Sequence, residues 1–144
     1  MVAYWLQHYT KGVGLKDAYD ILLVEDSPSQ ALQFQLVLQR AGFLVRVVID
    51  GAEGWRVACE DLPKLILLDI DLPTLDGFQI LGRLKRDRIT THIPVLMLTN
   101  REHISNVERA LSLGVDNYLF KDDAAEQLCA AVMQMLDTRE STTL

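Results

Sequence analysis

The chain has 144 residues, of which 49% are hydrophobic and 24% are charged, and its formal net charge is -6. This size and composition are typical of one globular domain, and no apolar stretch approaches the ~20 residues that a membrane span requires. The acidic balance argues against a general nucleic-acid surface, which would need a basic patch. No signal peptide is apparent, and Cys59 and Cys129 lie far apart in helical patterns, which indicates buried thiols in the reducing cytoplasm.

Strand and helix patterns alternate along the chain from residue 21 to residue 137. Continuous apolar runs predict five strands, at residues 21–24, 44–49, 65–68, 93–98 and 115–120. Helical spacing of apolar residues, with capping residues before it and stop signals after it, predicts five helices, at 28–41, 51–60, 77–86, 102–113 and 123–137. Each predicted strand is therefore followed by a predicted helix.

This alternation favours a doubly wound α/β fold. Short connections and right-handed crossovers place five such units in one parallel sheet with helices on both faces. The near-continuous apolar runs suit parallel strands that are covered on both sides. We expect the strand order 2-1-3-4-5, which is that of flavodoxin-like folds.

The first 19 residues do not fit a further unit. They contain an apolar and aromatic cluster of Tyr4, Trp5, Leu6 and Tyr9. We expect an N-terminal extension (1–19), one domain (20–138) and a polar C-terminal tail (139–144). The extension has two interpretations: a passive leader, or a short helix that docks on the domain or on a second copy of it.

Polar side chains follow four of the predicted strands. They are Glu25 and Asp26 after the first strand, Asp69 after the third, Thr99 after the fourth and Lys121 after the fifth. The carboxyl ends of parallel strands meet at one edge of the sheet, so these side chains should converge there. Each of them alone is more often a strand-end, capping or solvated residue, and the prediction of a site depends on their joint occurrence.

The chemistry of this set suits a divalent cation and a phosphoryl group. Three carboxylates supply the oxygen ligands that Mg²⁺ or Mn²⁺ prefers. Asp69 can act as a nucleophile toward a phosphoryl donor and become an aspartyl phosphate. Thr99 would donate its hydroxyl to a phosphoryl oxygen, and Lys121 would pair with the carboxylate or the phosphate.

Residues 20–137 resemble the receiver domain of two-component response regulators, which has a CheY-like fold. The motifs that carry the resemblance are ILLVED at 21–26, LLDIDLPTLDG at 67–77, MLTN at 97–100 and DNYLFK at 116–121. The resemblance implies a role for each matching position: the metal-binding acidic pair Glu25 and Asp26, the phosphoacceptor Asp69, a metal-ligating backbone carbonyl at Asp71, the switch residues Thr99 and Tyr118, and the active-site lysine Lys121.

The resemblance also implies a phosphorylation switch. A histidine kinase or phosphotransfer protein would supply the phosphoryl group. The domain would catalyse its own phosphorylation on Asp69 and its own dephosphorylation, without being a conventional enzyme. Thr99 and Tyr118 would then change the surface formed by 102–113, 115–120 and 123–137, which would bind a downstream protein. We expect a cytoplasmic protein that contacts neither DNA nor a membrane directly, has no effector domain, and has homodimerisation as an open option.

Three residues depart from the usual pattern of this family. Asp122 stands where the family usually has Pro after the lysine. We therefore do not expect the cis peptide bond that is usual in the family at this position, and Asp122 could compete for Lys121. Asn100 replaces a usually small residue and would narrow access to the phosphoryl group. Asp71 adds a carboxylate near the site. We expect these changes to affect rates more than the switch itself.

Several alternatives stay open. The domain is either a stand-alone receiver or a module excised from a hybrid histidine kinase. A non-switching interaction module with the same fold is a further alternative, although such modules usually lose one of the five site residues. A phosphatase of the haloacid-dehalogenase type would use Asp69 with Asp71 as general acid and base, but Pro73 stands where that family has Thr or Val.

Overall fold

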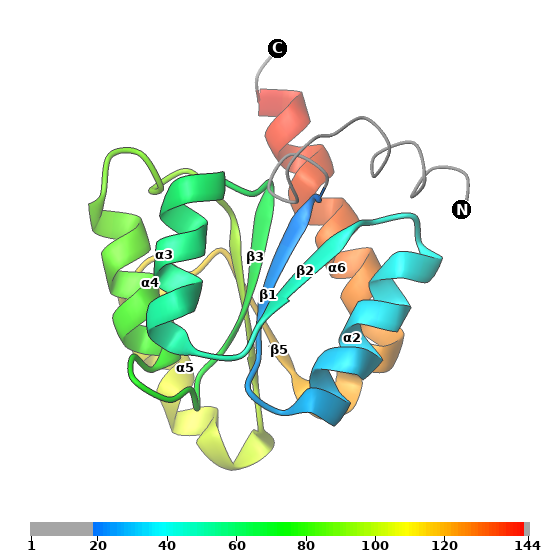
Figure 1. Ribbon diagram of the computed structural model, residues 1–144, viewed down its shortest axis with the longest axis horizontal. Helices are drawn as coiled ribbons and strands as arrows, with labels where there is room; N and C mark the ends of the chain where they lie inside the picture. Colours follow the sequence, from blue (N-terminus) through cyan, green and yellow to red (C-terminus); the bar gives the residue numbers. More distant parts are fainter. Residues whose placement is uncertain (1–18, 143–144) are drawn as a thin grey trace.

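The computed structural model describes residues 19–142, apart from the side chains of residues 102–104 and 138–142. Five parallel strands form a single sheet in this part of the chain (Figure 1). They are β1 (Ile21–Val24), β2 (Val45–Val48), β3 (Leu65–Asp69), β4 (Val95–Thr99) and β5 (Asn117–Phe120). The strand order is β2-β1-β3-β4-β5, which confirms the predicted order and the flavodoxin-like, CheY-like class.

Helices cover both faces of the sheet. Those that the structure describes are α2 (Pro28–Arg40), α3 (Gly51–Asp61), α4 (Gly77–Arg86), the 3₁₀-helix η2 (Arg101–Asn106), α5 (Val107–Ser112) and α6 (Lys121–Thr142). Helices α2 and α6 pack on one face, and α3, α4 and α5 pack on the other (Figure 1). No helix in the described part of the chain is long and apolar enough to cross a membrane.

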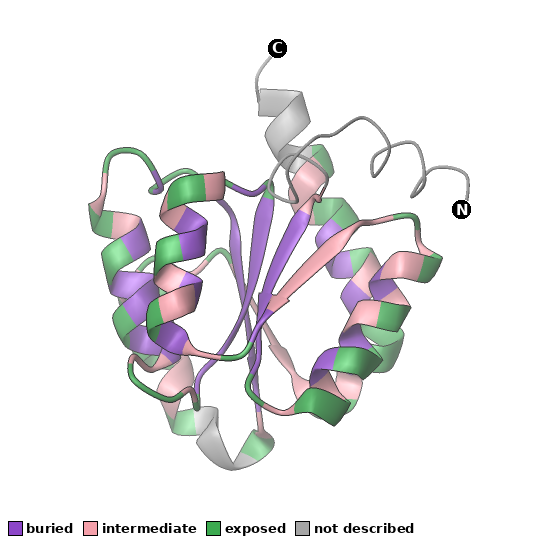
Figure 2. Cartoon of the chain, viewed as in Figure 1, coloured by how far each residue is buried: buried purple, intermediate pink, exposed green. Residues whose placement is uncertain are grey.

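The two faces of the sheet belong to two hydrophobic clusters. Leu22 and Val24 of β1 face the cluster shared with α3 and α4, whereas Ile21 and Leu23 face the cluster shared with α2 and α6. Every residue of β1, β3 and β4 is buried, while the edge strands β2 and β5 are mostly half-buried (Figure 2). The central strands need apolar residues on both faces, which explains why they appear as continuous apolar runs in the sequence.

The region predicted as one helix at 102–113 is divided in two. It begins as the 3₁₀-helix η2 and becomes α-helical only at Val107. Ser105 and Asn106 stand at the junction, and both residue types have low preference for helix interiors because their side chains compete for backbone hydrogen bonds. The short helix α5 therefore starts later than the spacing of its apolar residues suggests.

The last helix is longer than predicted. It begins at Lys121 instead of Asp123, and it continues past Asp137 to Thr142, over part of the predicted tail. A proline at position 122 would disfavour helical backbone at Lys121, and Asp122 removes that restriction. Asp122 and Asp123 also place negative charge in the first turn, where the helix dipole favours it. Lys121 is thus the first residue of a helix.

Candidate functional site

The predicted site residues meet at the C-terminal edge of the sheet, which is the lower edge in Figure 1. Glu25 follows β1, Asp69 ends β3, Thr99 ends β4 and Lys121 follows β5. Glu25, Asp69 and Thr99 are buried, with exposed fractions of 0%, 4% and 1%. Burial of two carboxylates at one place is costly, because charged groups lose their hydration there. The edge of the sheet therefore carries a polar site rather than solvated strand ends.

Lys121 holds the two buried carboxylates together. Its Nζ lies 2.9 Å from Glu25 Oε2 and 3.1 Å from Asp69 Oδ1. It also donates a hydrogen bond of 2.7 Å to Gln30 Oε1, from the first turn of α2. Glu25 is fixed further because its Oε1 accepts a hydrogen bond from the Ser27 amide at 3.1 Å. The lysine thus supplies one positive charge against two buried negative charges.

Asp122 pairs with Arg101 and not with Lys121. The expectation that Asp122 competes for Lys121 is therefore not met in this structure. The Asp122 carboxylate lies 3.4 Å from Arg101 Nε, and Arg101 also contacts Asp123 at 2.7 Å. The Arg101 guanidinium lies over the Phe120 ring, 4.8 Å from its centre. The Lys121–Asp122 peptide bond is trans. Arg101 therefore links the loop after β4 to the start of α6.

The charge balance changes the acidity of Asp69. Burial raises the pKa of Asp69 to about 7, the nearby Glu25 charge adds to the rise, and Lys121 opposes it. Burial by itself lowers the pKa of Lys121, but the Glu25 and Asp69 carboxylates outweigh it and raise the pKa above its usual value. Lys121 therefore stays charged at neutral pH, while Asp69 exchanges a proton near neutrality in the metal-free protein.

Replacement of Asp69 by asparagine should stabilise the metal-free protein at pH 8. An unfolded Asp titrates near 3.9, so between about pH 4 and pH 7 the folded protein binds a proton that the unfolded chain releases. The free energy of unfolding therefore falls as the pH rises through this window, because the buried Asp69 must become charged. Asparagine stays neutral at every pH, so the variant does not lose this stability. We expect Asp69→Asn to raise the free energy of unfolding by about 1–3 kcal/mol over the wild type at pH 8, and by little at pH 4.5. Urea unfolding in EDTA measures this difference.

The matched control for this measurement is Asp137→Asn, which removes an exposed carboxylate on α6. Exposed carboxylates contribute little to the pH dependence of stability, so this variant should follow the wild type at both pH values. A gain for Asp69→Asn that is the same at pH 4.5 and pH 8 would contradict the raised pKa of Asp69.

Thr99 and Tyr118 place two hydroxyl groups beside the acidic site. Thr99 is buried, and its Oγ1 donates a long hydrogen bond of 3.4 Å to the Asn100 carbonyl. Burial raises the pKa of Tyr118, and the neighbouring Thr99 hydroxyl partly offsets this rise. The Tyr118 hydroxyl oxygen is buried and makes no hydrogen bond of standard geometry within the described residues. Buried polar groups in folded proteins are nearly always hydrogen-bonded, so the Tyr118 hydroxyl is an exception at this site.

Three carboxylates form a candidate cation site. Glu25, Asp26 and Asp69 each offer an oxygen, and these oxygens lie within 4.8 Å of one another. Asp26 is exposed, so the cluster opens to solvent on one side. A set made only of oxygen atoms fits Mg²⁺, and the excess negative charge is what a divalent cation would neutralise. The side chain of Asp71 is exposed and is not a member of this cluster.

The loop between Asp69 and α4 is held by a close backbone contact at Gly77. The Gly77 amide donates a hydrogen bond of 2.8 Å to the Ile70 carbonyl. A Cβ atom at position 77 would lie 2.3 Å from the Asp69 carbonyl oxygen and 2.8 Å from Ile70 Cα. Asp76 caps the helix that follows, in a capping box with Gln79. Gly77 therefore fixes the backbone that carries Asp69.

Sequence reasoning missed Gln30 and Arg101. Gln30 is the third residue of α2, and the predicted cap at Ser27 was enough to place it in the first turn beside the site. Its contact with Lys121 spans 91 positions of the sequence, which no local pattern reveals. For Arg101, which follows Thr99 by two positions, we find no signal in the sequence that would have indicated its partners.

Known proteins with similar sequences match most of this chain. Residues 21–133 match the family model of the response regulator receiver domain. The DNA-binding dual master transcriptional regulator RpaA of Synechocystis is 38% identical over 116 residues, which cover 81% of this chain and 48% of that protein. The chain thus spans about half the length of this curated relative.

Solved structures of receiver domains have the same fold as this chain. A putative response regulator from Chloroflexus aurantiacus has a TM-score of 0.78 and 30% identity, covering 83% of this chain and 98% of its own. The receiver domain of the sensor histidine kinase PA1611 from Pseudomonas aeruginosa has a TM-score of 0.76 and 28% identity, with the same coverage, and carries a magnesium ion coordinated in its active-site cleft. With the family match and the strand order, these likenesses show that the chain belongs to the response regulator receiver domain family.

Proposed function

We propose that the unit of residues 20–138 is a phosphoryl-accepting switch. Asp69 would receive the phosphoryl group from a phosphohistidine of a histidine kinase or a phosphotransfer protein. The single observation that supports this best is the Lys121 ammonium, which contacts both the buried Asp69 and the buried Glu25. A structural ion pair needs only one carboxylate, whereas a phosphoryl site needs an acceptor, a positive charge and further oxygen ligands.

The placement of these residues supports a direct transfer step. A carboxylate oxygen of Asp69 attacks the phosphorus, an O–P bond forms and the N–P bond to the donor imidazole breaks. The electron pair of the broken bond stays on the imidazole nitrogen. Lys121, 3.1 Å from Asp69, is positioned to pair with the transferred phosphoryl group, and Thr99 would donate its hydroxyl to a phosphoryl oxygen. Water later attacks the phosphorus, which releases inorganic phosphate and restores the carboxylate.

Glu25, Asp26 and Asp69, with the backbone carbonyl of Asp71, are the groups that would hold Mg²⁺ or Mn²⁺. When bound, such a cation neutralises the carboxylates and the charge that develops on the phosphoryl oxygens. The magnesium ion in the receiver domain of PA1611 supports this assignment. Binding at this site would also remove the repulsion between Asp69 and Glu25 that raises the pKa of Asp69.

The readout would run through Thr99 and Tyr118. A phosphoryl group that draws the Thr99 hydroxyl toward Asp69 leaves space behind it, and the Tyr118 ring is the neighbouring group that can fill this space. Tyr118 lies on β5, between α5 and α6, so its movement alters the surface of these three elements. We propose that a downstream protein binds this surface. DNA binding, which the name of RpaA states, would belong to other parts of such proteins.

Two variants of this function differ in the donor. The likeness to the receiver domain of a sensor histidine kinase supports a phosphorelay module as the alternative to a response regulator. In both cases Asp69 is the acceptor. A receiver-like module that no longer switches is the remaining alternative, and it is distinguished by its failure to accept a phosphoryl group.

Intact-mass spectrometry after incubation with Mg²⁺ and acetyl phosphate tests the proposal. We expect a single labile phosphate adduct on the wild type, and no adduct on Asp69→Asn or in EDTA. Asp137→Asn, which removes an exposed aspartate, should keep the adduct. A wild type that forms no adduct and also binds no beryllofluoride in a titration with Mg²⁺ would be a non-switching module, and the proposal would fail.

A further inference from the structure

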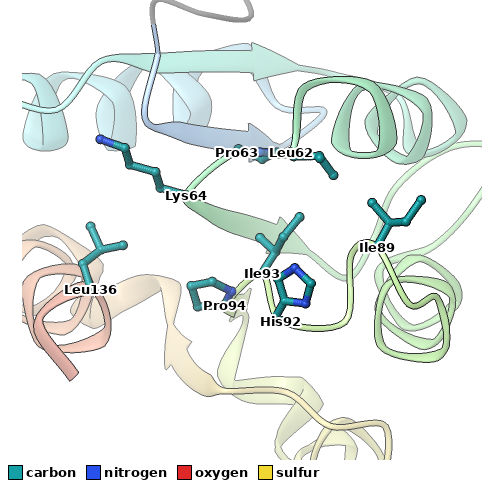
Figure 3. Close-up of a pocket in the computed structure, with 8 residues that line it drawn as sticks. All are labelled: Leu62, Pro63, Lys64, Ile89, His92, Ile93, Pro94 and Leu136. Carbon is teal, nitrogen blue, oxygen red and sulfur yellow. The ribbon is translucent and has the colours of Figure 1, made fainter. Parts of the chain in front are cut away.

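An open groove lies at the edge of the sheet opposite the acidic site, where the strands begin. Its walls come from the loop before β3 (62–64), the loop before β4 (89–94) and Leu136 of α6 (Figure 3). The groove has a volume of about 290 Å³ and a largely apolar lining. Leu62 and Ile89 on its walls are 47% and 61% exposed. Two exposed apolar side chains beside one apolar hollow are typical of a contact surface.

The chain enters the domain beside this groove. The Tyr19 hydroxyl donates a hydrogen bond of 2.5 Å to Asp61, which Arg46 also contacts at 2.8 Å. The next residue is Asp20, whose backbone carbonyl accepts a hydrogen bond of 3.0 Å from the Lys64 amide. The Asp20 carboxylate also forms an ion pair with the Lys64 ammonium, at 3.2 Å. Asp61 directly precedes the groove wall at 62–64, and Lys64 belongs to it. The segment before Tyr19 therefore starts from a fixed point at the groove.

We propose that the apolar and aromatic cluster of residues 4–9 covers this groove on its own domain. These residues lie outside the described part of the chain, and their composition suits an apolar hollow with a lysine and a histidine on its wall. Aromatic rings bury large apolar areas, and their faces attract an ammonium group such as that of Lys64. Tyrosine and tryptophan also keep a polar atom that can stay in contact with water.

The length of the intervening segment permits this contact. Tyr9 and Tyr19 are ten positions apart in the sequence, which corresponds to a mean distance of about 17 Å for a flexible chain and at most about 35 Å when extended. Gly12 and Gly14 lie in this segment and allow it to turn back. A short tether keeps the cluster at an effective concentration in the mM range, so a weak contact is enough to cover the groove.

The test uses the complete 144-residue chain with Trp55→Phe, because the sequence has two tryptophans and Trp5 then becomes the sole reporter. We expect emission at short wavelength and low quenching of Trp5 by acrylamide. Adding Ile89→Asp on the groove wall should shift the emission to longer wavelength and raise the quenching several-fold. Leu32→Asp is the matched control, since Leu32 is 54% exposed on α2, which does not line the groove. It should leave Trp5 unchanged.

Three outcomes would overturn the proposal. If acrylamide quenches Trp5 in the Trp55→Phe chain as strongly as in urea, Trp5 does not cover the groove. Trp5 that is shielded equally with and without Ile89→Asp binds elsewhere. Shielding that appears only as sedimentation shows a dimer would mean that a second copy covers the groove. None of these readouts depends on phosphorylation of Asp69, so this inference and the proposed function succeed or fail separately.

Discussion

Replacement of Lys121 by methionine should destabilise the metal-free domain by about 3–5 kcal/mol, because it leaves two buried carboxylates without their positive partner. Lys121 Nζ contacts both Glu25 and Asp69, and its side chain is 9% exposed. Methionine keeps much of the length of the side chain, so the loss reports the charge more than the packing. Urea unfolding at pH 8 in EDTA measures the effect.

Lys64→Met is the matched control. Lys64 also forms an ion pair, with Asp20 at 3.2 Å, but its side chain is 70% exposed. Exposed pairs contribute about 0–1 kcal/mol, so this variant should stay close to the wild type. A loss for Lys121→Met no larger than that of the control would show that the buried carboxylates do not depend on Lys121.

The same substitution should also distinguish stability from transfer. Mg²⁺ should restore part of the stability of Lys121→Met, since a cation in the carboxylate cluster replaces the missing charge. It should not restore transfer, because the phosphoryl group would still lack the ammonium. We expect the rate of adduct formation from acetyl phosphate to fall roughly 10²-fold. Recovery of both properties with Mg²⁺ would leave Lys121 a purely structural role.

The strands and most of the site could be predicted because their signals are local. A short apolar run such as Leu65–Leu68, within an alternating strand and helix pattern, is typical of a covered parallel strand, and a carboxylate directly after it then lies at the edge of the sheet. Glu25 and Asp69 therefore followed from the sequence together with the parallel topology. The register confirms the reason, since β1 and β3 pair residue by residue from Ile21 with Leu65 to Val24 with Leu68.

The contacts that set the charge balance could not be predicted. Whether Asp122 pairs with Lys121 or with Arg101 depends on where α6 begins, and the helix starts two residues earlier than its pattern suggests. The Gln30 contact depends on how α2 packs against α6, which is a tertiary result. The raised pKa of Asp69 follows from burial, and burial is known only once both faces of the sheet are covered.

Gly77→Ala should lower the free energy of unfolding by about 2–3 kcal/mol and abolish formation of the phosphate adduct, although the change adds a single methyl group. The new Cβ would meet the Asp69 carbonyl oxygen at 2.3 Å, and backbone atoms cannot turn aside as the end of a side chain can. The end of β3 must shift instead, and Asp69 moves with it away from Lys121. Urea unfolding and intact-mass spectrometry measure the two effects.

Gly82→Ala in the same helix separates this contact from the general effect of alanine. A Cβ atom at Gly82 would find its nearest neighbour, the flexible Arg86 side chain, at 3.5 Å. Alanine is favoured over glycine in helix interiors by about 0.5–1 kcal/mol, so Gly82→Ala should stabilise α4 and keep the adduct. The same substitution thus has opposite signs five residues apart. Equal behaviour of the two variants would mean that the approach of Gly77 to Asp69 does not position the acceptor.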